Sequence, residues 1–194
     1  MSSRVRILTV LALLTVVTTA TTVADAKRRP SAAKLRAIAA QECADADLEP
    51  ARDNLRRIRR AILCLHNKVR ARNGLPPLSE NLRLQRAAHR HTRDMVAGRY
   101  FEHTAPGGAT MVDRIVRARY VRVDEGWMLG ENLAWGTGSL GTPRGALEAW
   151  MDSPGHRANV LKRGYRELGV GVVARVPVSD AAGATYTVDF GVRK

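Results

Sequence analysis

The sequence predicts an α+β fold in which helices come first and a small antiparallel sheet comes last. Apolar residues recur every three to four positions through residues 54–74 and 81–97, as they do on one face of a helix. Two later runs, 167–176 and 185–192, have the composition of strands and are separated by a turn containing Pro177 and Gly183. Helices followed by strands indicate an α+β domain rather than alternating βαβ units.

The first 26 residues have the features of a secretory signal peptide. Two arginines precede an apolar stretch over residues 7–17, and Ala24-Asp25-Ala26 supplies the small residues of a cleavage site. The apolar stretch is too short and too rich in threonine to favour a membrane-spanning helix. We therefore expect export and cleavage, with no transmembrane span afterwards, although an uncleaved anchor is the alternative. Residues 27–42 are predicted to be a basic linker, and residues 43–194 the folded domain.

The chain is strongly basic, with 32 Lys and Arg against 18 Asp and Glu and a net charge of +14. Cleavage after residue 26 would remove two arginines and one aspartate and lower the charge to +13. This excess favours acidic envelope polymers or anionic lipid surfaces as partners, although a solvated, arginine-rich surface would also account for it. Export and the lack of a nucleic-acid-binding motif argue against a specific nucleic-acid partner.

Cys43 and Cys64 are the two cysteines of the chain. In the helix predicted for residues 54–74, Cys64 projects from the side nearly opposite the apolar stripe. An oxidising compartment favours a disulfide between them, which would strap residues 40–50 across the outer face of the helix. The chain-entropy model gives such a bridge about 3 kcal/mol of stabilisation. Two free thiols are the alternative.

Other local patterns predict where helices begin and how two histidines are used. Thr110 and Asp113 have the spacing of a capping box, which predicts a short helix ending near residue 120. Thr142-Pro143 predicts the start of a further helix. His91 lies within the apolar stripe of residues 81–97, so we expect a hydrogen-bonded core histidine. His66 borders the first stripe.

The segment Gly130–Leu161 contains the most informative polar residues. Side chains alternate faces along a strand, so Glu131 shares a face with Leu133, and a carboxylate there needs a partner. Ser153–His156 has the residue types of a first helical turn, with serine as the N-cap and proline next. The helix dipole favours a neutral imidazole at His156. His156 is therefore the partner that the sequence predicts for Glu131.

Several sequence blocks occur in order between Ala61 and Gly191: LHNKVRARNGLPPL, FEHT, GENLAWG, WMDSPGHRANVL, ELGVGV and YTVDFG. Together they resemble the conserved blocks of the CAP superfamily (cysteine-rich secretory proteins, antigen 5 and pathogenesis-related proteins), in the bacterial form with SPGHR. The resemblance implies an α-β-α sandwich with a small central antiparallel sheet. It also implies a structural hydrogen bond for His66.

The resemblance further implies a central cleft that in many relatives holds two histidines and two acids, and in some members a divalent metal. Transferred by motif, His103 and His156 are the histidines and Glu131 is one acid. The second acid position falls on Ser153, and Asp152 could replace it only by turning inward. Two imidazoles and one carboxylate still suit a zinc-like ion with an open position for water. The alternative is a hydrogen-bonded network without a metal.

We therefore expect a monomeric, exported binding module acting at the cell surface or outside the cell. Its ligand would be lipid-like, a small molecule or an envelope polymer, with a divalent metal in the cleft as an option. The candidate ligand-binding residues are His103, Glu131, Ser153 and His156, and no catalytic residue is assigned. A metal-dependent hydrolase of ester or peptide bonds is one alternative. A charge-driven adhesin for acidic wall polymers is the other.

Overall fold

The structure is a computed structural model that describes residues 30–193, so the predicted signal peptide lies outside the described residues. The described helices are α2 (Ala32–Ala40), α3 (Leu55–Arg72), α4 (Leu82–Gly98), α5 (Met111–Arg117), α6 (Pro143–Asp152) and α7 (Pro154–Val160). The strands are β1 (Ser79–Glu80), β2 (Trp127–Gly136), β3 (Glu167–Val173) and β4 (Ala184–Arg193), and a short 3-10 helix, η1, spans Gly138–Gly141. No helix within residues 30–193 is both long and apolar enough to cross a membrane.

The four strands form one sheet in the order β1-β3-β4-β2. β4 pairs antiparallel with both β2 and β3, whereas β1 pairs parallel with β3 through Ser79 opposite Glu167. The α+β prediction is confirmed, but the sheet is mixed rather than purely antiparallel. Because β1 is only two residues long, it has no alternation by which a sequence pattern could reveal it.

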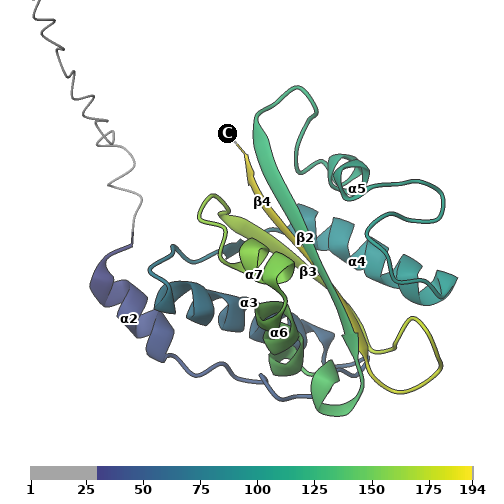
Figure 1. Cartoon of the computed structure of the whole chain (residues 1–194), viewed down its shortest axis with the longest axis horizontal. Helices are drawn as coiled ribbons and strands as arrows, with labels where there is room; N and C mark the ends of the chain where they lie inside the picture. The colour runs from purple at the N-terminus through teal and green to yellow at the C-terminus, as the bar shows by residue number, and fades with distance from the viewer. Residues whose placement is uncertain (1–29, 194) are drawn as a thin grey trace, which may run out of the picture.

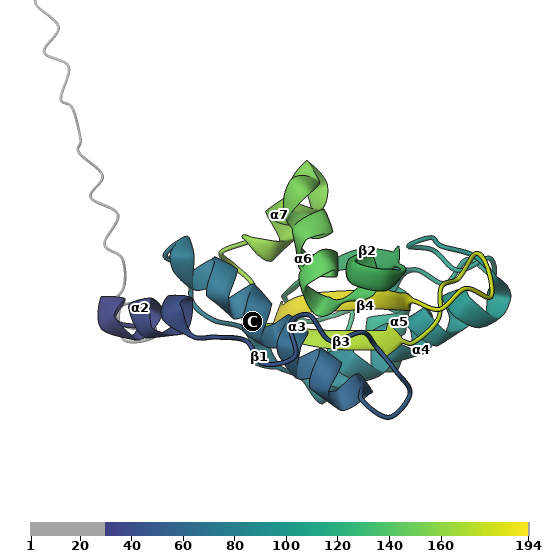
Figure 2. The same ribbon diagram turned by 90° about the horizontal axis from the view of Figure 1, so that it is seen from below.

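Helices cover both faces of the sheet, with α6 and α7 on one side and α4 on the other (Figures 1 and 2). Along β4, Tyr186, Val188 and Phe190 point into the core that also contains α3 and α6 residues. The alternate residue Thr187 faces α4, where its hydroxyl lies 2.9 Å from that of Thr92. The strand period of two therefore gives β4 an apolar face and a polar face, and the predicted α-β-α layering is confirmed.

Close packing of α4 on the sheet depends on the glycines of β3. A Cβ at Gly169 would lie 2.0 Å from the backbone nitrogen of Gln85, and one at Gly171 would lie 2.4 Å from the carbonyl carbon of Ala88. Real Cβ atoms cannot approach backbone atoms so closely, so glycine is required at both positions. This contact brings α4, and the loop that follows it, against the sheet.

Local capping residues fix where the helices near the site begin. Thr110 and Asp113 form the predicted capping box at the start of α5. Ser153 occupies the N-cap position of α7, but its side chain makes no capping hydrogen bond. The predicted N-cap position of Ser153 and the predicted start of the helix at Pro154 are therefore confirmed, although the serine hydroxyl does not cap the helix.

A disulfide and a buried arginine hold the N-terminal part of the domain. Cys43 and Cys64 form the predicted disulfide, with a Cα–Cα distance of 5.7 Å. Arg70, which is fully buried, donates to the carbonyl oxygens of Val160 at 2.8 Å and Lys162 at 3.0 Å. These bonds tie α3 to the segment that follows α7. By contrast α2, within the predicted linker, has no buried residue.

Candidate functional site

The site is built around Glu131 on β2, whose side chain is only 2% exposed. Tyr165 donates from its hydroxyl to the carbonyl of Leu129 at 2.9 Å, which places the tyrosine across the strand next to Glu131. A Cβ at Gly130 would lie 2.2 Å from that hydroxyl oxygen. Glycine before Glu131 is therefore required by the tyrosine.

Two cationic or potentially cationic side chains hold the Glu131 carboxylate. His103, in the loop after α4, has Nδ1 at 2.8 Å from Oε1, and Arg114 on α5 donates from Nη2 to Oε2 at 2.6 Å. Arg114 also donates to the carbonyls of His103 at 2.9 Å and Ala109 at 3.1 Å. The guanidinium therefore binds the carboxylate and fixes the loop that carries the histidine.

Burial and these partners act in opposite directions on the Glu131 pKa. Burial alone would raise the pKa, but the hydrogen bond from His103 and the charge of Arg114 hold it below its usual value. In return, the hydrogen bond with Glu131 raises the pKa of His103. The pair thus favours an ionised carboxylate beside a histidine that takes up a proton more readily than usual.

A second acid, Asp189 on β4, lies directly across from Glu131 in the sheet register. Asp189 is completely buried, and neither of its carboxyl oxygens has a hydrogen-bond partner among the described residues. Burial, followed by the charge of Glu131, raises the pKa of Asp189 well above its usual value. The burial of Asp189 beside the charge of Glu131 thus favours its protonated form.

His156 lies in the first turn of α7, which packs against β2. Its backbone carbonyl accepts from the side chain of Asn132 at 3.0 Å, and Asn159 donates to the backbone carbonyl of Glu131 at 3.2 Å. These amide bonds fasten α7 to β2. Burial lowers the pKa of the His156 ring, and the charge of nearby His103 lowers it further.

The structure brings together some of the predicted residues and not others. His103 and Glu131 are in direct contact, but His156 makes no hydrogen bond to either, so the predicted Glu131–His156 pairing is wrong. The two carboxylate oxygens of Glu131 are instead bound by His103 and Arg114. Ser153 is half-buried at the junction of α6 and α7 and has no side-chain hydrogen bond, and Asp152 is exposed.

Sequence reasoning missed Arg114 and Asp189. The capping box did predict a helix containing Arg114, but nothing in that pattern indicates that the arginine reaches β2. The alternation of YTVDFG separates Asp189 from the apolar face of its strand, yet only the pairing of β2 with β4 places it opposite Glu131.

His91 is confirmed as a hydrogen-bonded core histidine, with Nε2 at 2.9 Å from the carbonyl of Glu102. His66 is also confirmed, with Nδ1 at 2.8 Å from the carbonyl of Ile62.

The arrangement does not fit a divalent metal ion. Each oxygen of Glu131 already binds a positive or protonated partner, and an ion would have to displace Arg114, whose side chain is only 8% exposed. In the part of the chain that the structure describes, no three His, Cys, Asp or Glu side chains are grouped as a metal site requires. These contacts argue against the sequence-based option of a metal held by His103, Glu131 and His156, and zinc binding to the purified protein would test it directly.

The chain is similar in sequence to a known protein family and to two bacterial proteins. The model of the cysteine-rich secretory protein family, CAP, matches residues 63–188. The uncharacterized protein YkwD of Bacillus subtilis is 33% identical over 109 residues, which are 56% of this chain and 40% of that protein. The uncharacterized membrane protein YlbC of the same species is 32% identical over 111 residues, 57% of this chain and 30% of that protein. This chain thus spans less than half the length of these relatives.

Solved structures show the same fold. A 1.5 Å crystal structure of an extracellular protein containing an SCP domain from Bacillus anthracis is 32% identical, with a TM-score of 0.59 over 75% of this chain and 44% of that chain. An outer surface protein from Borrelia burgdorferi has a TM-score of 0.57 at 20% identity, over 75% and 96% of the two chains, and supports the fold alone. Because the family model matches residues 63–188, which include His103, Glu131 and His156, the chain belongs to the cysteine-rich secretory protein (CAP) family.

Proposed function

We propose that this chain is an exported binding module that works outside the cell and recognises an anionic group, a carboxylate or a phosphate, through His103. Three observations support the location. The N-terminal 26 residues have the features of a signal peptide, the Cys43–Cys64 disulfide suits an oxidising compartment, and the similar Bacillus anthracis protein is described as extracellular.

The observation that carries the ligand proposal is the two-sided environment of His103. Its side chain is 57% exposed, while its Nδ1 contacts a carboxylate whose side chain is 2% exposed. That contact places a proton on Nδ1 and raises the ring pKa, which favours the imidazolium form. An imidazolium fixed in this way donates from Nε2, and charge-assisted hydrogen bonds to carboxylate or phosphate are the stronger kind.

His156 supplies a second, chemically different contact. Its lowered pKa keeps the ring neutral, so it can accept a hydrogen bond as well as donate one. A ligand that carries an acidic group beside a hydroxyl would satisfy both rings. Glu131 takes no direct part in this recognition, because its oxygens are buried and already bonded to His103 and Arg114.

The same opposite pKa shifts favour a second candidate, a hydrolase with His103 as acid and His156 as base. Ser153 is the nearest candidate nucleophile in sequence, but its hydroxyl has no hydrogen bond to a histidine among the described residues. For this reason the binding module is the preferred function. The metal-dependent version of the hydrolase has the additional difficulty that the site does not fit a metal.

Thermal unfolding of residues 27–194 tests the proposal with a panel of acetate, inorganic phosphate, glycerol phosphate and neutral glycerol at pH 6. We expect one or more of the acids to raise the Tm of the wild type and of the control His89→Gln, whose imidazole lies on α4. The rise should vanish in His103→Gln. A rise that persists in His103→Gln, or no response to any acid, would refute the proposal. Turnover of a chromogenic ester that His156→Gln abolishes would establish the hydrolase instead.

A further inference from the structure

Four arginines form a straight row on the outer face of α4. Arg83, Arg86, Arg90 and Arg93 are spaced by three, four and three residues and are all exposed. At about 100° per residue they fall within an arc of about 80°, opposite the buried stripe of the helix. The row is about 15 Å long, because the rise per residue is about 1.5 Å. Figure 2 shows α4 against the sheet on the side opposite α6 and α7.

These four charges are not compensated by the protein itself. No ion pair joins any of them to a carboxylate within residues 30–193, although Arg57, Arg122 and Arg144 elsewhere on the surface do form such pairs. Like charges three and four residues apart on a helix repel one another and slightly destabilise it. The row therefore adds nothing to the stability of α4, and its guanidinium groups are available to an external anionic partner.

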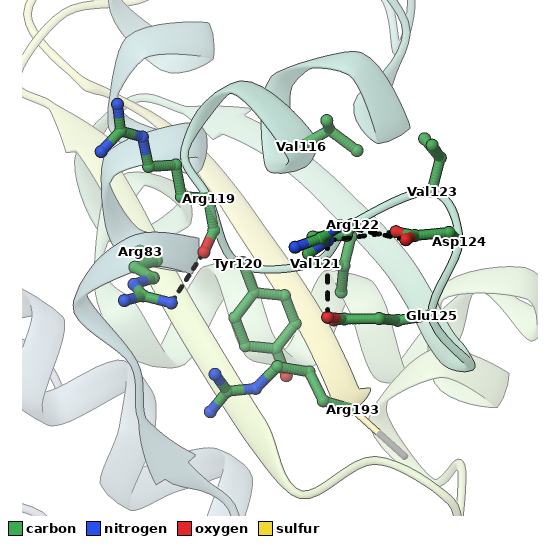
Figure 3. A pocket seen from close by; sticks show the side chains of 10 residues that line it. All are labelled: Arg83, Val116, Arg119, Tyr120, Val121, Arg122, Val123, Asp124, Glu125 and Arg193. Atoms are coloured by element: carbon green, nitrogen blue, oxygen red, sulfur yellow. Dashed lines mark hydrogen bonds and ion pairs between the residues drawn. The ribbon is translucent and has the colours of Figure 1, made fainter.

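A hollow lies at the N-terminal end of the row, where Arg83 stands next to the ring of Tyr120 (Figure 3). This cavity has a volume of about 740 Å³. Arg83 donates to the backbone carbonyl of Arg119 at 2.8 Å, which fixes the rim, and Arg193 stacks over Tyr120 with its guanidinium carbon 4.9 Å from the ring centroid. Arg122 also lines the cavity, where it is paired with the lining carboxylates Asp124 and Glu125.

Two more cavities lie along the same helix. One of about 240 Å³ is lined by Arg90 and Arg117 near the middle of the row. Another of about 500 Å³ lies at the C-terminal end, where Arg93 is joined by Arg52 and Arg175. Each of the three hollows thus contains one arginine of the row together with arginines from other segments. Carboxylates also line these cavities, so the row of exposed arginines, rather than any one cavity, carries the excess positive charge along α4.

We propose that this arginine row, Arg83, Arg86, Arg90 and Arg93, binds an extended envelope polymer that carries repeated phosphodiester groups. Guanidinium groups bind phosphate oxygens in a bidentate manner, and weak contacts repeated along one chain add up to a stable complex. A small anion could touch only neighbouring arginines, whereas a linear polymer can follow all four. The proposal rests on the extracellular location proposed above but not on the His103 site.

Synthetic poly(glycerol phosphate) is the probe for the test. The row variant carries Arg83→Gln, Arg86→Gln, Arg90→Gln and Arg93→Gln. The matched control loses the same charge elsewhere, through Arg56→Gln, Arg60→Gln, Arg72→Gln and Arg163→Gln, all exposed positions. We expect wild-type binding that weakens steeply with salt, a loss of about tenfold or more in the row variant, and a loss of less than about threefold in the control. Unfolding curves verify that both variants fold.

The outcomes distinguish binding by the arginine row from attraction of the polymer by net charge alone. Equal losses in the two variants would show that net charge alone attracts the polymer and would overturn the proposal, as would undiminished binding by the row variant. A duplex DNA with the same number of phosphates is the comparison ligand, and tighter binding of the DNA would replace the envelope polymer with a nucleic acid. The response of His103 to small acids is measured separately, so either proposal can fail without the other.

Discussion

Replacing Arg114 with methionine tests how strongly the site depends on its buried ion pair. The guanidinium is 8% exposed and binds a carboxylate that is 2% exposed. Removing one partner of a buried pair leaves the other charge uncompensated, which typically costs about 3–5 kcal/mol. In Arg114→Met the charge of Glu131 would face only His103 and the neutral Asp189. We therefore expect the free energy of unfolding at pH 7 to fall by an amount in this range.

The loss should depend on pH in a defined direction. In the wild type His103 and Arg114 hold the pKa of Glu131 below its usual value, so the stabilisation is present above the unfolded pKa of about 4.3 and is lost as the pH falls through the folded pKa. In Arg114→Met burial dominates and raises the pKa of Glu131, so the carboxyl accepts a proton more readily. The difference between variant and wild type should consequently shrink between pH 7 and pH 4. Urea unfolding at the two pH values measures it.

Two controls separate the ion pair from other effects of the substitution. Arg122→Met removes an arginine that is 72% exposed and paired with Asp124, and should cost less than about 1 kcal/mol. A double-mutant cycle with Glu131→Gln should recover part of the loss, while the remainder reports the two carbonyl bonds of Arg114. A cost equal to that of Arg122→Met, or one unchanged by Glu131→Gln, would refute this reasoning.

Three other measurements extend the account. Because burial raises the pKa of Asp189, wild-type stability should fall by up to about 1.4 kcal/mol per pH unit above the unfolded pKa of about 3.9, until the folded pKa is reached. Asp189→Asn should remove this slope and be more stable than the wild type at pH 7, as chemical unfolding across pH would show. Reduction of the disulfide, or Cys64→Ser, should cost about 3 kcal/mol, measured by unfolding with and without reductant; no change would mean that the bridge does not limit the unfolded chain. Zinc at pH 7.5 should leave the wild-type Tm unchanged, and a rise that His156→Ala abolishes would establish the metal site.

The sequence blocks indicated the fold and two of the central side chains, because both depend on local pattern. Helical periodicity located α3 and α4, and strand alternation set Glu131 apart as a carboxylate on an apolar face. The motif that carries His103 then pointed to a histidine close to it. The structure joins the two at 2.8 Å.

The remaining partners depend on contacts between elements, which a sequence pattern does not specify. His156 is near Glu131 along the motifs, but the side chain of Glu131 turns towards α5, where Arg114 lies 17 residues earlier in the chain. Asp189 becomes a neighbour only through the pairing of β2 with β4. The parallel pairing of β1 likewise arises from the chain path into α4, since two residues carry no periodicity.

The ring pKa of His103 is the most direct test of the central claim that Glu131 holds this histidine as a cationic donor. Nuclear magnetic resonance of the labelled ring can follow the titration in the wild type and in Glu131→Gln, with Ser153→Ala as a control near the site. The account predicts a pKa above the usual value of about 6.5 in the wild type and in the control, and a lower pKa in Glu131→Gln. A wild-type pKa at or below the usual value, or one that Glu131→Gln leaves unchanged, would contradict it.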